Sequence, residues 1–166
     1  MRHFIERGHT KIAGYFKSDD IQGHQRYSGF ISELFRNGLI IPDENVFWYT
    51  TETKETLFDK PEDVLKQLGD NTAVVCYNDE IAFSLVKCLL AADRRIPEDI
   101  AVVSFDNSSL SRISPVPITS LSYEGRNIGR IAAQKLVDIL NGKEVCSEVV
   151  QWSLVQRESS VVTSRI

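Results

Sequence analysis

The sequence predicts an α/β domain, a three-layer α/β/α sandwich built around a mostly parallel sheet. Segments with the hydrophobic pattern of strands alternate with segments of helical periodicity along the whole chain, which is typical of parallel strands joined by helical crossovers. In addition, residues 73–76 are apolar without alternation, as expected of a strand buried on both faces. The length of 166 residues allows one domain with a sizeable core.

The first segments predict a helix end, a strand and a long helix. Residues 1–8 have the pattern of a helix terminus with Gly8 as its left-handed stop, and residues 11–16 form a short apolar strand. Ser18 to Asp20 offer N-cap side chains for a helix that Asn37-Gly38 ends. The side chains expected to face the core from this helix are those of Tyr27, Phe30, Ile31, Leu34 and Phe35.

The central segments predict strand and helix twice in succession. Strand 46–49 runs into polar residues, and Pro61 occupies the first turn of a helix that Gly69 stops. After strand 73–76, Asn78 is the expected N-cap of a helix whose first turn carries acidic side chains. The apolar residues that recur at helical spacing behind it are Ile81, Ala82, Leu85, Val86, Leu89 and Leu90.

The rest of the chain, from residue 100, predicts three further extended segments and a return helix. The expected elements are, in order, a buried strand 100–105, a helical turn 108–114, an extended piece 119–122, an amphipathic helix 124–141 and a strand region 148–156. Pro115 and Pro117 end the helical turn, and Gly142 follows the amphipathic helix. The side chains expected to face inward from that helix are those of Ile128, Ile131, Ala132, Leu136 and Leu140.

The composition argues against several classes of function. The formal net charge of -4 disfavours direct DNA binding by this segment, because phosphate binding needs a basic surface. The three cysteines include no CxxC pair, which indicates reduced thiols, a cytoplasmic location and no metal site. No apolar run approaches the ~20 residues that span a bilayer, and the N-terminus lacks the apolar core of a signal peptide.

Polar clusters follow four of the predicted strands, at residues 17–22, 49–52, 77–80 and 106–107. Ligands of open parallel sheets bind outside the carboxyl ends of the strands, so these clusters predict a binding site along one rim. The chain contains no glycine-rich phosphate loop, no GxSxG and no HExxH, and its histidines have no nucleophile or metal partner in sequence. The expectation is therefore a protein that is not an enzyme and that needs no cofactor.

Five motifs stand in a fixed order, RGHTKIA at 7–13, QRYSGF at 25–30, NDEIA at 78–82, IPEDIAVVSFD at 96–106 and LVQRES at 154–159. Together they resemble the effector-binding domain of the LacI/GalR transcription regulators. Within that family, KSDDIQG at 17–23 and CYNDEIA at 76–82 are most similar to the arabinose repressors. Ser104 and Ser153 stand where the family commonly has glycine and proline.

The resemblance implies a periplasmic-binding-protein-like fold of type I, with two α/β lobes hinged around a sugar and paired as a homodimer. Residues 1–122 would be the carboxyl-terminal lobe, truncated at its start, and residues 143–166 the closing strands and tail. The helix in residues 123–142 would return to the other lobe, so its apolar face is expected to seek another partner, such as a neighbouring chain. Operator DNA would be bound only through a GntR-type winged-helix domain that this chain lacks.

The resemblance also implies which residues bind the ligand. Arg26 matches an arginine that donates to sugar hydroxyls, and Asp106 matches an aspartate that accepts from them. The alternatives are a solvated helix arginine and an aspartate that caps a turn. Asn78 either faces the ligand or only caps its helix, while Gln22 and Lys17 lie at the mouth of the site or at a solvated helix start.

Two tyrosines complete the set of candidates. Tyr49 could provide an aromatic wall for the apolar face of a sugar, although a tyrosine at a strand end is also typical of a core. Tyr123 falls at the lobe crossover, where the family often has a polar ligand contact. A rival interpretation of Asp106 is the phosphoacceptor of a receiver domain, but the sequence shows no matching lysine in the context that such a domain has.

The predicted function is the effector-binding domain of a repressor that senses a sugar, with L-arabinose as the expected ligand. Sugar binding would release operator DNA through a shift between open and closed lobes. A sugar-binding protein of a transport system is the first alternative, because it shares the fold. An enzyme that acts on sugar phosphates is the second.

Overall fold

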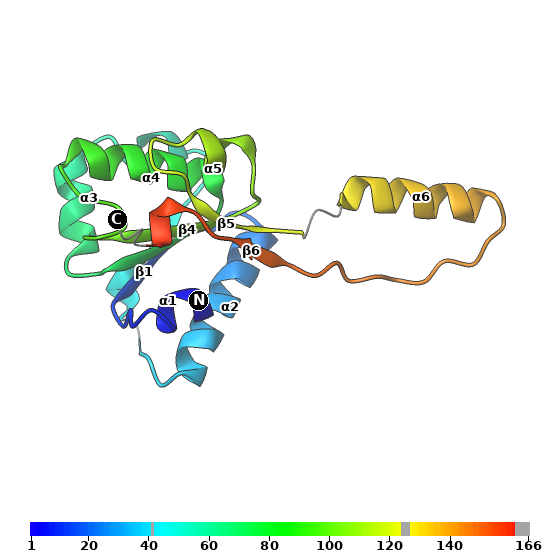
Figure 1. The fold of residues 1–166 in the computed structure, drawn as a ribbon, viewed down its shortest axis with the longest axis horizontal. Helices are drawn as coiled ribbons and strands as arrows, with labels where there is room; N and C mark the ends of the chain where they lie inside the picture. Colours follow the sequence, from blue (N-terminus) through cyan, green and yellow to red (C-terminus); the bar gives the residue numbers. More distant parts are fainter. Residues whose placement is uncertain (41, 124–126, 162–166) are drawn as a thin grey trace, which may run out of the picture.

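The computed structural model describes residues 1–40, 42–123 and 127–161 (Figure 1). Within these ranges one six-stranded sheet has the order β2-β1-β3-β4-β5-β6. Its strands are β1 Ile12–Lys17, β2 Val46–Tyr49, β3 Ala73–Cys76, β4 Ala101–Phe105, β5 Thr119–Ser122 and β6 Ser153–Val155. All neighbouring strands are parallel except β6, which pairs antiparallel with β5. The predicted mostly parallel sheet is therefore confirmed.

Helices cover both faces of this sheet. They are α1 Arg2–Ile5, α2 Ile21–Arg36, α3 Pro61–Leu68, α4 Asp79–Ala91, α5 Ser109–Ile113 and α6 Ile128–Leu140. Short 3-10 turns are η1 Asp43–Asn45, η2 Lys54–Thr56 and η3 Glu158–Ser160. Figure 1 shows α1 and α2 on one face and α3, α4 and α5 on the other. Each face has its own buried apolar cluster, which confirms the three-layer sandwich.

The capping residues set the helix starts as expected. The Asp20 carboxylate accepts a hydrogen bond from the amide of Gly23 at 2.6 Å, and α2 begins at Ile21, the residue after Asp20. The Asn78 side chain accepts from the amide of Ile81 at 3.0 Å at the start of α4. Because these caps lie directly after β1 and β3, they place both helix N-termini at the carboxyl rim of the sheet.

Three expectations need correction. Phe35 does not face the core, since its side chain is 79% exposed. The buried stripe of α2 runs through Phe30 and Leu34, and consecutive helical residues point about 100° apart, so Phe35 turns away from the sheet. Leu90 follows the buried Leu89 on α4 and is exposed for the same reason. The last strand is confined to Ser153–Val155, because only these residues pair with β5.

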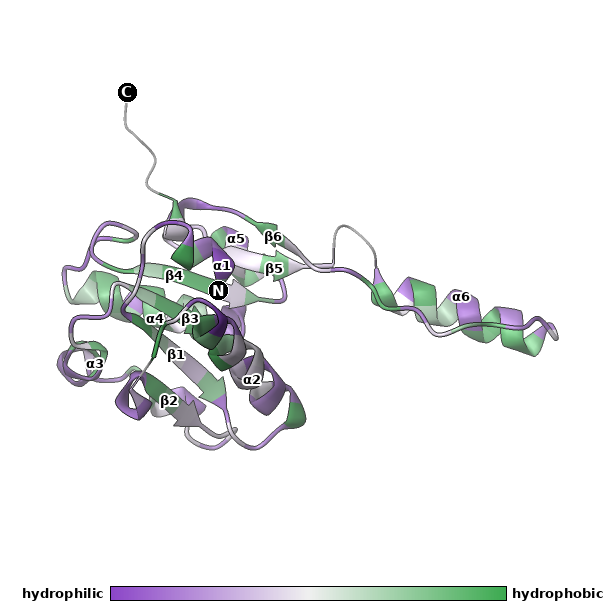
Figure 2. Cartoon of the chain, turned by 90° about the horizontal axis from the view of Figure 1, so that it is seen from below, coloured by the Kyte–Doolittle hydropathy of each residue, from purple (hydrophilic) through white to green (hydrophobic). Residues whose placement is uncertain are grey.

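The arm, residues 127–152, extends away from the rest of the described chain, which we call the body. Figure 1 shows α6 pointing away from the sheet and the following segment returning beside it. The expected helix 124–141 is observed from Ile128, with Asn127 as its N-cap, and residues 124–126 lie outside the described residues. No residue of α6 is buried, and Figure 2 shows apolar positions along its surface. The expected inward face of this helix is therefore not packed into a core within the described chain, although Lys135 donates to the Cys146 carbonyl of the returning segment.

Candidate ligand-binding site at the carboxyl rim of the sheet

Arg26 is held in one position by the residues around it. Its guanidinium carbon lies 4.6 Å from the centre of the Tyr77 ring and 4.5 Å from that of Phe105. One nitrogen donates to the Tyr77 carbonyl oxygen, and Nη2 donates to Oδ1 of Asp106 at 3.0 Å. The Arg26 side chain is only 10% exposed, so it is not a solvated surface arginine. A guanidinium fixed in this way presents its remaining donors in a defined plane.

Asp106 lies directly after β4, in a turn with unusual backbone geometry. Its φ angle is 98° and that of Asn107 is 49°, so two successive non-glycine residues are left-handed. Such conformations are unfavourable and persist only where the surroundings hold them. The Asp106 side chain remains partly exposed at the rim, beside Arg26. The structure thus brings together the two side chains that the sequence singled out first.

Gln22 and Lys17 surround a second polar cluster at the start of α2. The Tyr77 hydroxyl donates to Oδ2 of Asp20 at 2.7 Å and lies 3.4 Å from Oε1 of Gln22. Lys17 Nζ forms ion pairs with Asp19 at 3.4 Å and Asp20 at 3.3 Å. Gln22 is therefore an exposed neighbour of Tyr77, and Lys17 is a half-buried neighbour of Asp20. Ligand contact by either residue stays a prediction.

Hydrogen bonding also fixes the charges of this cluster. The Thr51 amide, which donates to Asp19 at 2.9 Å, lowers the Asp19 pKa to about 2. Burial opposes ionisation of Asp20, but hydrogen bonds from Tyr77 and Gly23 bring its pKa below the ordinary value. Burial and the neighbouring Asp20 raise the pKa of Tyr77 to about 12. At neutral pH the carboxylates are charged and the phenol is a neutral donor.

Asn78 and Tyr49 have clear structural roles. The Asn78 side chain caps α4, as described above, and is half-buried. Tyr49 is 3% exposed, and its ring packs edge-on against Tyr77 with the centroids 6.1 Å apart. This is the core position that the sequence left open as the alternative for Tyr49. Ligand contact by either residue stays a prediction.

Tyr123 belongs to an aromatic wall beside Arg26. Its ring stacks on Trp152 with centroids 3.7 Å apart, and Trp152 meets the edge of Phe105 at 6.3 Å. The antiparallel pairing of Ser122 with Ser153 brings Tyr123 and Trp152 together across the base of the arm. Sequence reasoning missed Trp152, because nothing local in the sequence shows which residue the end of β5 will meet.

A groove of about 590 Å³ lies beside Arg26, between helices α1 and α2 and strands β3 to β5, with Trp152 just before β6. Arg26 and Gln22 line its polar side, and Tyr123 and Trp152 line its aromatic side. Of the seven predicted residues, Arg26, Gln22 and Tyr123 thus line the groove, and Asp106 adjoins it through Arg26. Lys17, Asn78 and Tyr49 are not among the lining residues. An apolar wall with a few directional polar groups is typical of small-molecule sites.

A buried carboxylate that the sequence analysis treated only as a first-turn acid lies below this rim. Asp79 is 1% exposed and accepts hydrogen bonds from the hydroxyls of Ser104 and Ser120. Ser104 is the residue that departs from the family glycine, and the structure gives it this hydrogen-bonding role. No local signal distinguished Asp79 from the exposed Glu80 beside it, because both are ordinary acidic residues at a helix start.

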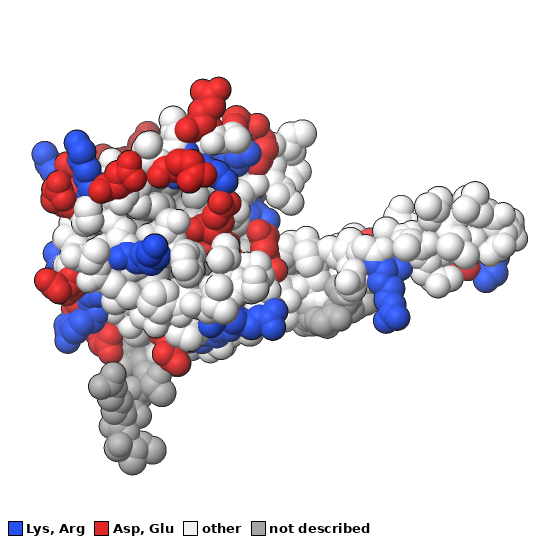
Figure 3. All heavy atoms as spheres, turned by 90° about the horizontal axis from the view of Figure 1, so that it is seen from above, with Lys and Arg blue, Asp and Glu red and all other residues white. Residues whose placement is uncertain are grey.

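The described residues contain no cluster of histidine, cysteine and acidic side chains that could hold a metal ion. Nor does the described part of the chain include a helix with the length and apolar character of a membrane span. Figure 3 shows acidic and basic side chains interspersed over one side of the body, while the arm is largely uncharged in this view.

Comparison with known proteins places these features in a family. Residues 1–160 match the family described as periplasmic binding protein-like domain. The chain is 34% identical over 144 residues to the arabinose metabolism transcriptional repressor of Halalkalibacterium halodurans, covering 84% of this chain and 38% of that protein. It is 33% identical over 149 residues to the repressor of the same name from Geobacillus stearothermophilus, covering 86% and 40%.

Solved structures agree with the sequence relatives. A CelR–cellobiose complex superposes with a TM-score of 0.81 and 29% identity, covering 95% of this chain and 49% of that one. The regulator GntR from Chromobacterium violaceum has a TM-score of 0.85 at 22% identity, over 96% of this chain and 59% of that one, which supports the fold alone. The chain spans about two fifths of the length of the arabinose metabolism repressors. The chain therefore belongs to the periplasmic binding protein-like domain family, in the form found in the effector-binding domains of LacI-type transcriptional regulators.

Proposed function

We propose that this chain is the ligand-sensing part of a transcriptional repressor and that its effector is L-arabinose. The observation that carries the proposal is the pairing of Arg26 with Asp106 at 3.0 Å, at the mouth of an aromatic-walled groove. This pair provides planar donors and an acceptor side by side, which matches the adjacent hydroxyls of a sugar. The names of two relatives, both arabinose metabolism repressors, support the choice of sugar.

The charges at the rim favour an uncharged ligand. Three basic groups there are paired with carboxylates, Lys17 with Asp19 and Asp20, Arg26 with Asp106, and Lys54 with Glu80, while Arg157 donates to the Asn107 side chain and the Ile118 carbonyl. These pairs comprise three cations and four carboxylates, so they provide no excess positive charge for a phosphate group. We therefore propose a neutral sugar in preference to a sugar phosphate.

The proposed mechanism is a shift between two conformations of a larger protein. Residues 1–122 would form one lobe, residues 123–142 would reach a second lobe, and residues 143–166 would close the first. A sugar that binds better between closed lobes moves the equilibrium only by that difference in affinity. In a homodimer the closed state would separate the DNA-binding heads from their operator spacing and release the DNA.

We propose no catalytic activity and no cofactor. The similar proteins described above are named as transcriptional regulators, which favours a cytoplasmic repressor over a transport protein of the same fold.

The test is calorimetric titration of the full polypeptide that the gene encodes. L-arabinose is the ligand, and D-glucose and D-galactose are the controls. We expect arabinose to bind, Arg26→Lys to weaken binding at least about tenfold because a lysine lacks the planar fork, and Arg26→Ala to abolish it. Arg36→Ala is the matched control, because Arg36 lies on the same helix with its side chain 75% exposed.

The outcomes separate the parts of the proposal. Binding of arabinose that survives Arg26→Ala would show that the site lies elsewhere. Absence of binding to all three sugars would remove the arabinose assignment. Circular dichroism of each variant checks that the fold is retained.

A further inference from the structure

The turn at residues 106–108 is held by backbone hydrogen bonds from three consecutive amides. The Asp106 amide donates to the Leu121 carbonyl at 3.0 Å, and the Asn107 amide donates to the Ser120 hydroxyl at 2.9 Å. The Ser108 amide donates to Oδ2 of Asp79 at 2.5 Å. These bonds explain how two left-handed non-glycine residues persist in succession.

Asp79 is the buried anchor of this turn. Its Oδ1 accepts from the Ser120 hydroxyl at 2.6 Å and from the Ser104 hydroxyl, while its Oδ2 receives the Ser108 amide. A carboxylate buried to this degree is tolerated only when donors surround it, and three donors do so here. Ser120 accepts from Asn107 and donates to Asp79, so the turn is connected directly to the buried charge.

The Asn107 side chain fastens the turn from the other side. Its Oδ1 accepts from Nη2 of Arg157 at 2.5 Å, and its Nδ2 lies 3.2 Å from the Ser122 hydroxyl. Arg157 in turn donates from Nη1 to the Ile118 carbonyl at 2.7 Å. Asn107 is thus connected to the end of β5 and to the segment that follows β6, the two strands that flank the arm.

We propose that Asp79, Asn107 and Arg157 are positioning residues for ligand recognition, because together they hold Asp106 against Arg26. The inference rests on the proposed function, in which Asp106 accepts hydrogen bonds from the ligand. Asp79 fixes the backbone of the turn from below, and the pair of Asn107 and Arg157 fixes it from the side of β5 and β6. Asp106 itself contributes the carboxylate at the rim.

The decisive variant is Asn107→Gly. Glycine adopts positive φ without strain, so this change keeps the backbone conformation available and removes only the side-chain bonds to Arg157 and Ser122. The matched control is Asp93→Gly, since Asp93 also has a positive φ, of 55°, but lies after α4, outside the turn. Arg157→Gln is a second variant that leaves residues 106–108 unchanged.

The first readout needs no ligand. We expect amide hydrogen exchange at residues 106–108 to become at least about tenfold faster in Asn107→Gly and in Arg157→Gln, while exchange in β1 and β3 stays as in the wild type. Asp93→Gly should leave residues 106–108 unchanged. Unchanged exchange at 106–108 in both variants would overturn the proposal.

The second readout is the affinity of the full polypeptide for L-arabinose. We expect Asn107→Gly to weaken it roughly tenfold and Asp93→Gly to leave it unchanged. Wild-type affinity in Asn107→Gly would overturn the positioning role while the proposed function stood. If the wild type binds no sugar but exchange still accelerates at 106–108, the positioning of Asp106 is supported and the proposed function fails.

Discussion

The helices of the body and the helix of the arm have similar sequence patterns and opposite surroundings. On α2, Phe30 and Leu34 recur at helical spacing and are buried against the sheet. On α6, Ile128 and Leu136 belong to a comparable stripe, yet no residue of the helix is buried. Apolar periodicity therefore predicts that a helix forms and which side is apolar, but it does not identify what covers that side.

The largest difference in stability between the body and the arm is expected when a leucine in each is shortened to alanine. Leu85 on α4 is 0% exposed, whereas Leu136 on α6 is 57% exposed. We expect Leu85→Ala to lower the free energy of unfolding by about 2–5 kcal/mol, because it removes buried contacts and leaves a cavity. Leu136→Ala should change it by less than about 0.5 kcal/mol. Denaturant unfolding of both variants measures this, and equal losses would mean that α6 packs against something in solution.

Two glycines of α2 provide a similar contrast between a packed position and an open one. A Cβ at Gly23 would stand 1.8 Å from the Lys17 carbonyl oxygen, whereas a Cβ at Gly29 would meet nothing within 4 Å. Gly23→Ala must push α2 away from β1, and we expect a loss of roughly 1–3 kcal/mol. Gly29→Ala should instead stabilise by about 0.5–1 kcal/mol, because alanine favours the helix. Thermal unfolding of the two variants measures the expected loss of stability in the first and the expected gain in the second.

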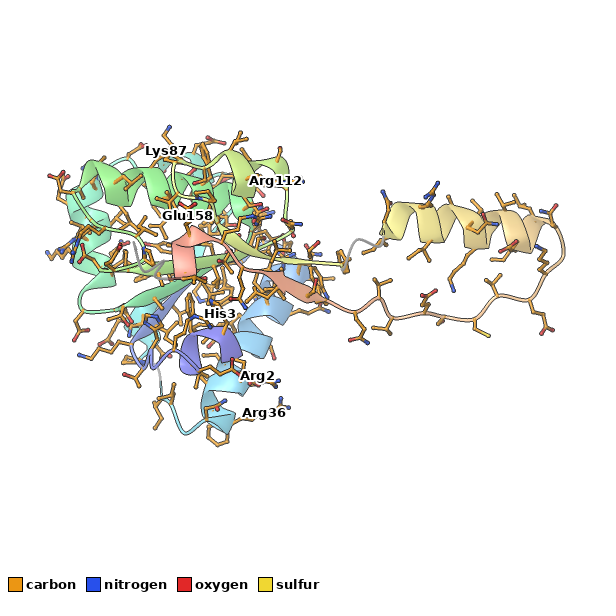
Figure 4. The ribbon with its side chains drawn as sticks, in the orientation of Figure 1. Arg2, His3, Arg36, Lys87, Arg112 and Glu158 are labelled. Atoms are coloured by element: carbon orange, nitrogen blue, oxygen red, sulfur yellow. The ribbon has the colours of Figure 1, made fainter. Side chains whose placement is uncertain are left out.

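Low pH should reduce the stability of the body because of His3. Arg7 donates to Nδ1 of His3 at 2.9 Å, so Nε2 carries the proton and donates to the Ser160 hydroxyl at 2.7 Å. Figure 4 shows α1, with His3, in the body near η3, which carries Glu158. Burial, together with the nearby Arg7 charge, lowers the His3 pKa from 6.5 to about 4.

The sign of the effect follows from these two values. Between pH 6.5 and 4 the unfolded chain binds a proton that the folded chain does not, so stability falls as the pH falls through this window. His3→Gln should reduce this pH dependence. It should not remove it, because burial also lowers the pKa of His9. Denaturant midpoints at pH 7 and pH 5 provide the measurement, and an equal pH slope in His3→Gln would contradict the assignment.

The smallest effect is expected from polar substitution on the arm. Ile139 and Leu140 are exposed, so Ile139→Gln combined with Leu140→Gln should change the unfolding free energy of the body by no more than about 0.5 kcal/mol. The same pair should reduce binding of a hydrophobic dye, because it removes exposed apolar surface. A large loss of stability would show that α6 contributes to the core of the body.

Much of the fold was predictable because its signals are local. The caps at Asp20 and Asn78, the apolar run of β3 and the glycine after α1 each lie within a few residues of the boundary that they set. Phe35 was predicted wrongly although the helical spacing from Leu34 already turns it away from the sheet, and the extent of β6 was predicted wrongly because strand pairing depends on neighbours that are distant in sequence.

The candidate site also divides into residues with a local sequence signal and residues without one. Arg26 and Asp106 were found through motifs, and the structure places them together. Trp152 and Arg157 were missed because their partners, Tyr123 and Asn107, lie on segments that are distant in sequence. Their roles follow from the pairing of β5 with β6, which no local pattern specifies.

The antiparallel pairing of β5 with β6 also makes the arm an insertion between two adjacent strands. Ser122 and Ser153 face one another in adjacent strands, so the polypeptide leaves the sheet and re-enters it at neighbouring points. A short two-residue turn could connect the same two strands as a hairpin without altering their register. The six-stranded sheet would keep the same strand order. The connection between β5 and β6 is therefore a place where inserted segments of very different length can replace one another while the body keeps its fold.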